Sequence, residues 1–314
     1  KIFKNDNTFS IGANTPTSLA QDAQNAGATF SNNSWGESNS GAYNTDSATF
    51  DALVRDADPV EPGNQQVVYF FSAGNDGPAA MTIGSPASGK NVIAIGAAEN
   101  SDADGIDSGN IGPADSDNIR DIVFFSNRGP TADGRLGVTL VTVGTHVQGP
   151  ASTVAGYAGT SVNNKYWPAN QTDYARSSGT SHSCPLACGA GMIVHELFNA
   201  QLASLGHTAN PGPALIKAVL VATATDLVGG SDGAGGTTAN LPNVNQGWGA
   251  VNLTNLTEMK NALYSLDQTH VFTASSQTFE VTLTPVVLDM PFKVTLAWTD
   301  QPAVPAASPT LIND

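Results

Sequence analysis

In one segment of the chain, a glycine-led turn runs directly into a long apolar stretch, and a serine stands at the junction. The segment reads Ser178-Gly-Thr-Ser-His-Ser-Cys-Pro185, and the apolar residues that follow predict a buried helix over Ser181–Leu202. A helix N-terminus presents free N–H groups and the positive end of its dipole, so a hydroxyl placed there lies where a developing oxyanion is stabilised. The segment predicts a fold built around one central helix, with Ser181 as a candidate nucleophile.

Short apolar strands alternate with helical stretches over the first two thirds of the chain. Such alternation favours a parallel sheet with helices on both faces, which is an α/β three-layer fold. We expect this domain to span residues 1–260. The expected strands are Thr29–Ser31, Val67–Phe71, Asn91–Ala97, Asp121–Phe124 and Leu136–Val143. The other expected helices are Thr17–Ala26, Ser47–Asp56 and Pro213–Thr225.

The pattern changes near the C-terminus. Residues Phe279–Leu283 and Phe292–Trp298 alternate apolar and polar side chains, as strands of an all-β module do. Two such strands are too few for an independent sandwich. We therefore expect residues 265–314 to be the incomplete beginning of a second, small all-β domain.

Two further segments follow expected strands. The first is Ser72-Ala-Gly-Asn75, which ends in an asparagine. The second is Ser34-Trp-Gly36, which comes directly after the first expected strand.

Taken in order along the chain, these segments resemble the motifs of the subtilisin-like serine peptidases. The run Trp298-Thr-Asp-Gln-Pro302 resembles the branch of that family with a C-terminal β-sandwich. The resemblance implies that residues 265–314 are the beginning of such a jelly-roll-like β-sandwich domain. The resemblance implies a secreted serine endopeptidase that forms an acyl-enzyme on Ser181, with Asn75 as an oxyanion donor and no cofactor needed for the chemistry. It also implies that a polypeptide substrate is bound by Ser34, Trp35, Gly36, Ser72, Ala73 and Gly74.

The family supplies its triad aspartate and histidine through Asp-Ser/Thr-Gly and His-Gly-Thr motifs, and no segment here resembles either. The chain has five histidines, which are His146, His182, His195, His207 and His270. His182 follows Ser181 on the expected helix and would point about 100° away from it. We therefore expect the base and its carboxylate to lie upstream, in an N-terminal part of the same enzyme that would be a partner of this chain. The chain looks truncated at both ends, and by itself we expect it to be inactive.

Two other interpretations remain open at this stage. The chain could be a non-catalytic relative or fragment of such a peptidase that acts as a binding or structural module. It could also belong to the sedolisin-type carboxyl-serine peptidases, which share the Gly-Thr-Ser signal. That family has an aspartate at the oxyanion position, whereas this chain has Asn75.

The charge balance and apolar runs exclude some partners. The formal net charge is -15, with 12 Lys and Arg residues against 27 Asp and Glu residues. No basic surface is therefore expected to bind nucleic acid. No apolar run approaches the roughly 18 residues of a membrane span.

A structural calcium ion is the one cofactor that the sequence suggests. The loop Ser101–Asp107 places Asp102, Asp104 and Asp107 around a glycine, as calcium loops do, but it lacks the later glutamate of such loops. The two cysteines, Cys184 and Cys188, lie one turn apart on the expected central helix and are predicted to be free buried thiols.

Overall fold

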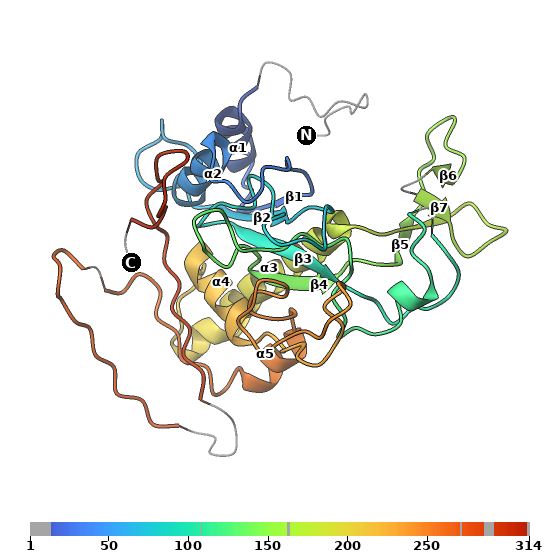
Figure 1. Cartoon of the computed structure of the whole chain (residues 1–314). Coiled ribbons are helices and arrows are strands. Elements are labelled where there is room, and N and C mark those ends of the chain that lie inside the picture. The colour runs from blue at the N-terminus through green and yellow to red at the C-terminus, as the bar shows by residue number, and fades with distance from the viewer. Residues whose placement is uncertain (1–13, 108, 162–163, 271, 286–291, 313–314) are drawn as a thin grey trace.

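The computed structural model describes residues 14–107, 109–161, 164–270, 272–285 and 292–312 (Figure 1). Residues 1–13 of the expected first domain and residues 313–314 of the expected second therefore lie outside the described residues. The helices are α1 (Pro16–Asn25), α2 (Thr45–Arg55), α3 (Thr180–Ala200), α4 (Pro213–Ala222) and α5 (Leu253–Met259), with 3-10 turns η1 (Pro113–Asp115) and η2 (Leu202–Leu205). The strands are β1 (Phe30–Asn33), β2 (Val68–Ser72), β3 (Ile93–Ala98), β4 (Leu140–Val143), β5 (Val147–Pro150), β6 (Thr160–Ser161), β7 (Asn164–Tyr166) and β8 (Tyr174–Ser177).

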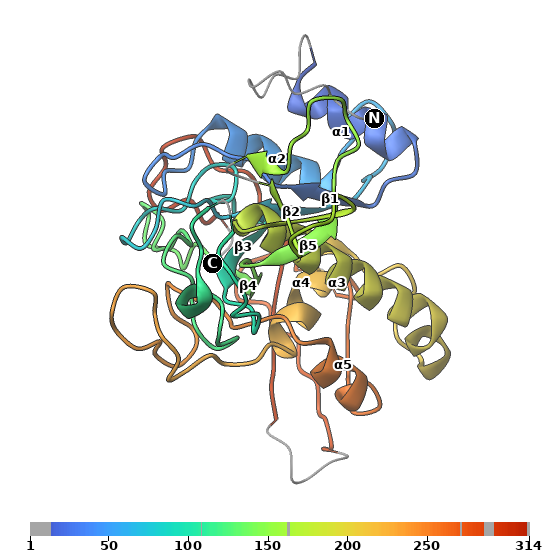
Figure 2. The ribbon, with the colours of Figure 1, turned by 90° about the vertical axis from the view of Figure 1, so that its right-hand side faces the viewer.

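A parallel four-stranded sheet, in the order β1-β2-β3-β4, forms the middle layer. Figures 1 and 2 show α1 and α2 on one face of this sheet and α3 and α4 on the other. All residues of β2 and β3 are buried, as expected for a parallel sheet covered on both sides. The expected α/β three-layer fold is therefore confirmed.

Side chains alternate between two apolar clusters, one on each face of the sheet. Along β2, Val68 and Phe70 pack in the cluster that contains α3 and α4. Tyr69 and Phe71 point the opposite way and pack in the cluster that contains Phe50 of α2. This period of two residues follows from the pleat of a strand. The helix α3 crosses all four strands, so its first turn is held at a fixed place over the sheet.

Two expectations about the strands were wrong or incomplete. The expected strand Asp121–Phe124 is no strand, because Ile122 makes only an isolated bridge to Ala98 and its N–H bonds to Ser231 instead. The expected strand Leu136–Val143 is reduced to β4, because only Leu140–Val143 pair with β3. The antiparallel sheet β5-β8-β7-β6 was not expected at all. It forms an arm that extends from the main sheet (Figure 1).

Within the part of the chain that the structure describes, no helix is long and apolar enough to cross a membrane.

The described residues after Met259 contain no assigned strand, and the two expected β segments run as extended chain (Figure 1). The boundary near residue 260 and the β-sandwich beyond it therefore stay predictions. Asp300, near the end of this segment, nevertheless bonds residues directly before β3. Asp300 accepts a bond from Lys90 at 2.6 Å, and both side chains are almost fully buried. The Asn91 amide donates to the Asp300 carbonyl at 2.7 Å, and its oxygen accepts from the Asp300 N–H at 2.8 Å.

We predict that Asp300→Asn destabilises the protein strongly, because it leaves the buried Lys90 ammonium without its carboxylate. Breaking a buried ion pair by removing one partner costs about 3–5 kcal/mol. Urea unfolding of the variant measures this loss. Glu61→Gln makes the same change of charge at an exposed position and is the control. Equal stability of the two variants would contradict the prediction.

A second contact of this segment predicts a dependence on pH. Burial by itself raises the pKa of Asp133, but hydrogen bonds from Arg135, Thr131 and Thr310 outweigh burial and hold that pKa well below its usual value. A carboxyl group with a lowered pKa stabilises the fold above the unfolded-state pKa, which is about 4, and this contribution is lost as the pH falls below it.

The free energy of unfolding should therefore differ most between the wild type and Asp133→Asn at neutral pH, and the difference should shrink below pH 4. Unfolding curves measured between pH 7 and pH 2.5 test this. A difference that does not change with pH would show that the carboxylate charge is not the cause.

Candidate active site around Ser181

The candidate nucleophile stands in the first turn of α3. The N-cap residue Gly179 has φ +148°, a conformation that side chains rarely adopt, and it turns the chain from β8 into the helix. Ser181 is half-buried, and its Oγ lies 3.4 Å from the carbonyl oxygen of Ser34. The serine hydroxyl thus faces the segment that follows β1.

A proline four residues further on explains how the two segments are joined. Pro185 has no N–H, so it cannot make the intrahelical bond that the Ser181 carbonyl would otherwise accept. The Ser34 hydroxyl donates to that carbonyl instead, at 2.8 Å. Pro185 therefore frees a backbone acceptor of the first helical turn, and Ser34 uses it to attach the end of β1 to Ser181.

Asn75 is exposed and reaches the same place from the end of β2. Its side-chain oxygen accepts bonds from the N–H and the hydroxyl of Thr180, both at 2.9 Å. The Thr180 N–H can only donate, so the oxygen of the Asn75 amide must face it, because the NH₂ group cannot accept a hydrogen bond. These bonds therefore fix the orientation of the amide and direct its NH₂ group away from Thr180. A Cβ atom added to Gly179 would lie 3.7 Å from both Asn75 Nδ2 and Ser181 N, and 3.8 Å from Asn75 Oδ1. The Asn75 amide group and the Ser181 nitrogen therefore flank one space, which a glycine at 179 keeps open. Since Thr180 occupies Oδ1, the group left to donate there is the Asn75 NH₂.

The residues expected to line the substrate differ in their surroundings. Ser34 is beside Ser181, as described, and Gly36 packs so closely on Ser85 that a Cβ atom would lie 2.7 Å from its carbonyl oxygen. Trp35 turns toward the core, where its ring meets Phe50 and Phe71 edge-on.

The other expected wall follows β2. The side chains of Ser72 and Ala73 are buried, while Gly74 is half-buried. Any contact of this wall with a substrate would therefore be made largely by its backbone.

None of the five histidines, all of which lie among the described residues, forms a hydrogen bond with Ser181 Oγ. The ring nitrogens of His146 approach the carbonyls of Asp102 and Ile111 at 2.6 and 3.0 Å, so this buried residue has a structural place. The remaining rings contact residues elsewhere: His195 meets Asn199, His207 meets Ser265, and His270 stacks on Phe279.

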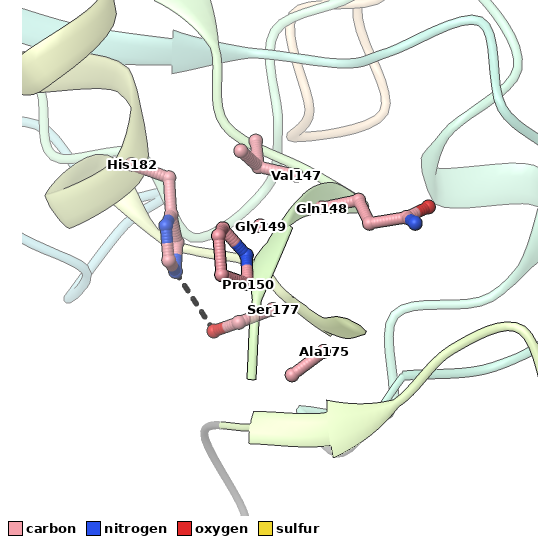
Figure 3. Close-up of a pocket in the computed structure, with 7 residues that line it drawn as sticks. All are labelled: Val147, Gln148, Gly149, Pro150, Ala175, Ser177 and His182. Atoms are coloured by element: carbon pink, nitrogen blue, oxygen red, sulfur yellow. Dashed lines mark hydrogen bonds between the residues drawn. The ribbon is translucent and has the colours of Figure 1, made fainter. Parts of the chain in front are cut away.

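His182 lines a hollow of about 180 Å³ on the arm side of the helix start, shown in Figure 3. Its Nε2 lies 2.8 Å from the Ser177 hydroxyl. Burial lowers the pKa of His182, and the nearby charge of Asp107 opposes that shift. The ring points toward Ser177 and not toward Ser181 Oγ, as its position in the helix predicts. The other residues that line the hollow are Val147, Gln148, Gly149, Pro150 and Ala175.

The expected calcium loop is organised by protein groups. The buried guanidinium of Arg176 bonds Asp102 at 3.2 Å and stacks over the Trp167 ring at 3.9 Å. Asp107 accepts from the Ser178 hydroxyl at 2.5 Å and from the N–H of Ile111 at 3.1 Å. Among the described residues, Asp102, Asp104 and Asp107 do not gather as a set of metal ligands.

A different set of carboxylates gathers nearby. Atoms of Glu99, Asp117 and Asp121 lie within 4.8 Å of one another and could hold a cation. Burial raises the pKa of Glu99 to about 7. The expectation of a structural calcium ion stays a prediction.

Comparison with known proteins identifies the family to which this chain belongs. A profile of the subtilase family matches residues 5–249, which is most of the chain. The chain therefore belongs to the subtilase family, and the resemblance drawn from its motifs is confirmed.

Individual relatives cover the chain less completely. Over 129 residues it is 36% identical to tripeptidyl-peptidase 2 of Caenorhabditis elegans, a match that covers 39% of this chain and only 8% of that relative. Among solved structures, it is similar to the prenylagaramide maturation protease PagA, with 20% identity, a TM-score of 0.49 and coverage of 77% of this chain and 65% of that one. It is also similar to sphericase, with 19% identity, a TM-score of 0.47 and the same coverage.

Sequence reasoning missed Thr180, which holds the Asn75 amide and stands in the Gly-Thr-Ser run itself. The sequence did carry a signal for this role. Thr180 directly precedes the candidate nucleophile at the start of a helix, where backbone N–H groups have no intrahelical partner and need an acceptor from elsewhere.

Proposed function

We propose that this chain carries the nucleophile and the oxyanion site of a serine endopeptidase that cleaves extended polypeptides through an acyl-enzyme on Ser181. The observation that carries the proposal is the space beside Gly179, which Asn75 Nδ2 and Ser181 N flank. Two N–H donors around one point suit a tetrahedral oxyanion. The Ser181 N–H belongs to the first turn of α3, where backbone donors lack an intrahelical partner.

The base and its carboxylate would come from a segment outside these 314 residues. The hydroxyl of Ser181 faces a carbonyl, which cannot take its proton. Among the described strands, β1 pairs with β2 only, so one edge of the sheet is open. Carboxyl ends of parallel strands meet at one edge of a sheet, so a parallel strand added to β1 would end near Ser34 and Ser181.

Apolar side chains at this edge support the same arrangement. Phe30, Met192 and Ile193 line a hollow of about 350 Å³ beside β1, and the two α3 residues are about half exposed. A further strand or helix would bury them.

In the proposed reaction, the substrate lies along Ser34–Gly36 as an added strand, with the wall at Ser72–Gly74 beside it. The base takes the Ser181 proton as Oγ attacks the carbonyl carbon, and the amine leaves with a proton from the protonated base. Asn75 and the Ser181 N–H hold the oxyanion, and water then hydrolyses the ester. No metal is needed for these steps. We further propose that the protein acts outside the cell, as its resemblance to secreted members of the family suggests.

The alternative is a non-catalytic relative that binds peptides or has a structural role. The lack of a histidine bonded to Ser181 Oγ among the described residues favours it. Removal of the base costs about 10⁶ in turnover, a value measured on a member of this family, so the chain alone should be nearly inert.

A fluorophosphonate probe separates the two functions, because it reacts with a serine activated by a base. We expect the native protein to be labelled on Ser181, as located by peptide mass spectrometry, and Ser181→Ala to remove the label. Ser177→Ala is the matched control, since Ser177 already contacts a histidine. A label that disappears in Ser177→Ala and stays in Ser181→Ala would contradict the proposed nucleophile. A folded native protein that takes no label would favour the non-catalytic role.

We predict that Asn75→Ala lowers kcat of the native protein by about 10²–10³ and changes KM much less, because the donor acts on the transition state; the magnitude comes from a member of this family. Steady-state hydrolysis of a chromogenic peptide measures both constants. Asn240→Ala, on an exposed loop, is the control. A loss confined to KM would mean that Asn75 binds the ground state.

A further inference from the structure

Asn127 is a buried asparagine that forms hydrogen bonds with the residues around Asn75. Its exposed fraction is 1%, and it lies in the long connection between β3 and β4. Its amide nitrogen donates to the carbonyls of Ala73 at 2.9 Å and Thr82 at 2.6 Å, and its amide oxygen accepts from the Asp76 N–H at 2.5 Å. Its backbone N–H also donates to the Gly74 carbonyl at 3.0 Å. One residue thus bonds both chain neighbours of Asn75.

Close packing explains why this arrangement is rigid. Gly74 has φ +110°, and a Cβ atom placed on it would lie 2.1 Å from Asn127 Nδ2. The chain therefore passes directly over the amide group, with no room for a side chain or a water molecule between them. Only an amide supplies both a donor and an acceptor at this site, since a carboxylate has no donor and a hydroxyl is too short to span it.

Asn75 is consequently held from two sides. Thr180 fixes its side chain, as described above, and Asn127 fixes the backbone on which that side chain stands. Asn127 itself is buried beneath the loop and has no path to a substrate.

We propose that Asn127 is a positioning residue, which sets the catalytic geometry of Asn75 without touching the substrate. The inference rests on the proposed function, in which Asn75 donates to the oxyanion. A donor stabilises the oxyanion well only when it lies about 2.7–3.1 Å from it. A small displacement of residues 73–76 therefore reduces the stabilisation of the transition state more than the binding of the substrate. Asn127 therefore contributes to kcat through Asn75.

A double-mutant cycle on the native protein tests this route. Asn127→Ser should lower kcat by about 10–100-fold and change KM less than about 3-fold, since part of the effect of a lost oxyanion donor is expected. In the Asn75→Ala background the same substitution should lower kcat by less than about 2-fold, because residues that act as a unit are not additive.

Asn91→Ser is the matched control, because Asn91 is also buried and also forms hydrogen bonds through its side-chain amide. Its partners are Asp51 and Asp300, which are not part of the segment around Asn75. This substitution should lower the urea concentration at the midpoint of unfolding and leave kcat of the folded protein unchanged. If Asn127→Ser does not fold, Asn127→Asp keeps the acceptor for the Asp76 N–H and takes its place. An equal loss of kcat with and without Asn75 would overturn the proposal, as would a loss in Asn127→Ser no larger than in Asn91→Ser.

A second measurement separates this inference from the proposed function. If the native protein hydrolyses no peptide, the proposed function fails, and the position of Asn75 can still be observed by NMR. The side-chain NH₂ group of Asn75 should be ordered in the ¹⁵N-labelled 314-residue chain and in Asn91→Ser, and mobile in Asn127→Ser. An equally ordered NH₂ group in all three would show that Asn127 does not position Asn75.

Discussion

The packing of α3 across the parallel sheet places the whole candidate site. The helix contacts all four strands, and its apolar side chains share one buried cluster with Val68, Phe70 and Ile95 of the sheet. Because that cluster packs the helix against the sheet, its first turn lies at a defined place beside the ends of β1 and β2. Ser34 and Asn75 follow those two ends, and both bond the first turn of the helix. The site is thus a consequence of core packing.

Each bond at the site uses a group that the helix end leaves unpaired. The N–H of Thr180 would have no intrahelical partner, and Asn75 accepts it. The carbonyl of Ser181 has lost its partner to Pro185, and Ser34 donates to it. Satisfying these backbone groups therefore orients the two side chains that the proposed chemistry needs. Stability and preorganisation have the same physical origin here.

Much of the fold could be predicted because its patterns are local. The helices α1, α2, α3 and α4 begin and end within three residues of their expected bounds, since caps, prolines and apolar periodicity mark them. The expected strand at Asp121–Phe124 failed because its partner, Ser231, is more than a hundred residues away. Asn127 and Arg176 escaped notice for the same reason. Their roles depend on packing against Gly74 and Trp167, and nothing in the neighbouring sequence indicates such contacts.

The attachment of Asp300 to Lys90 also bears on the order in which the molecule can be completed during synthesis. The buried ammonium of Lys90 and the amide of Asn91 take their partners from a segment some 210 residues later in the chain. Chain elongation at about 5–20 residues per second separates their emergence from the ribosome by roughly 10–40 s. During that interval the apolar clusters around the sheet can form, because their residues lie earlier in the chain. A chain that ends before residue 300 would therefore leave the Lys90 ammonium and the Asn91 amide without the partners that Asp300 supplies.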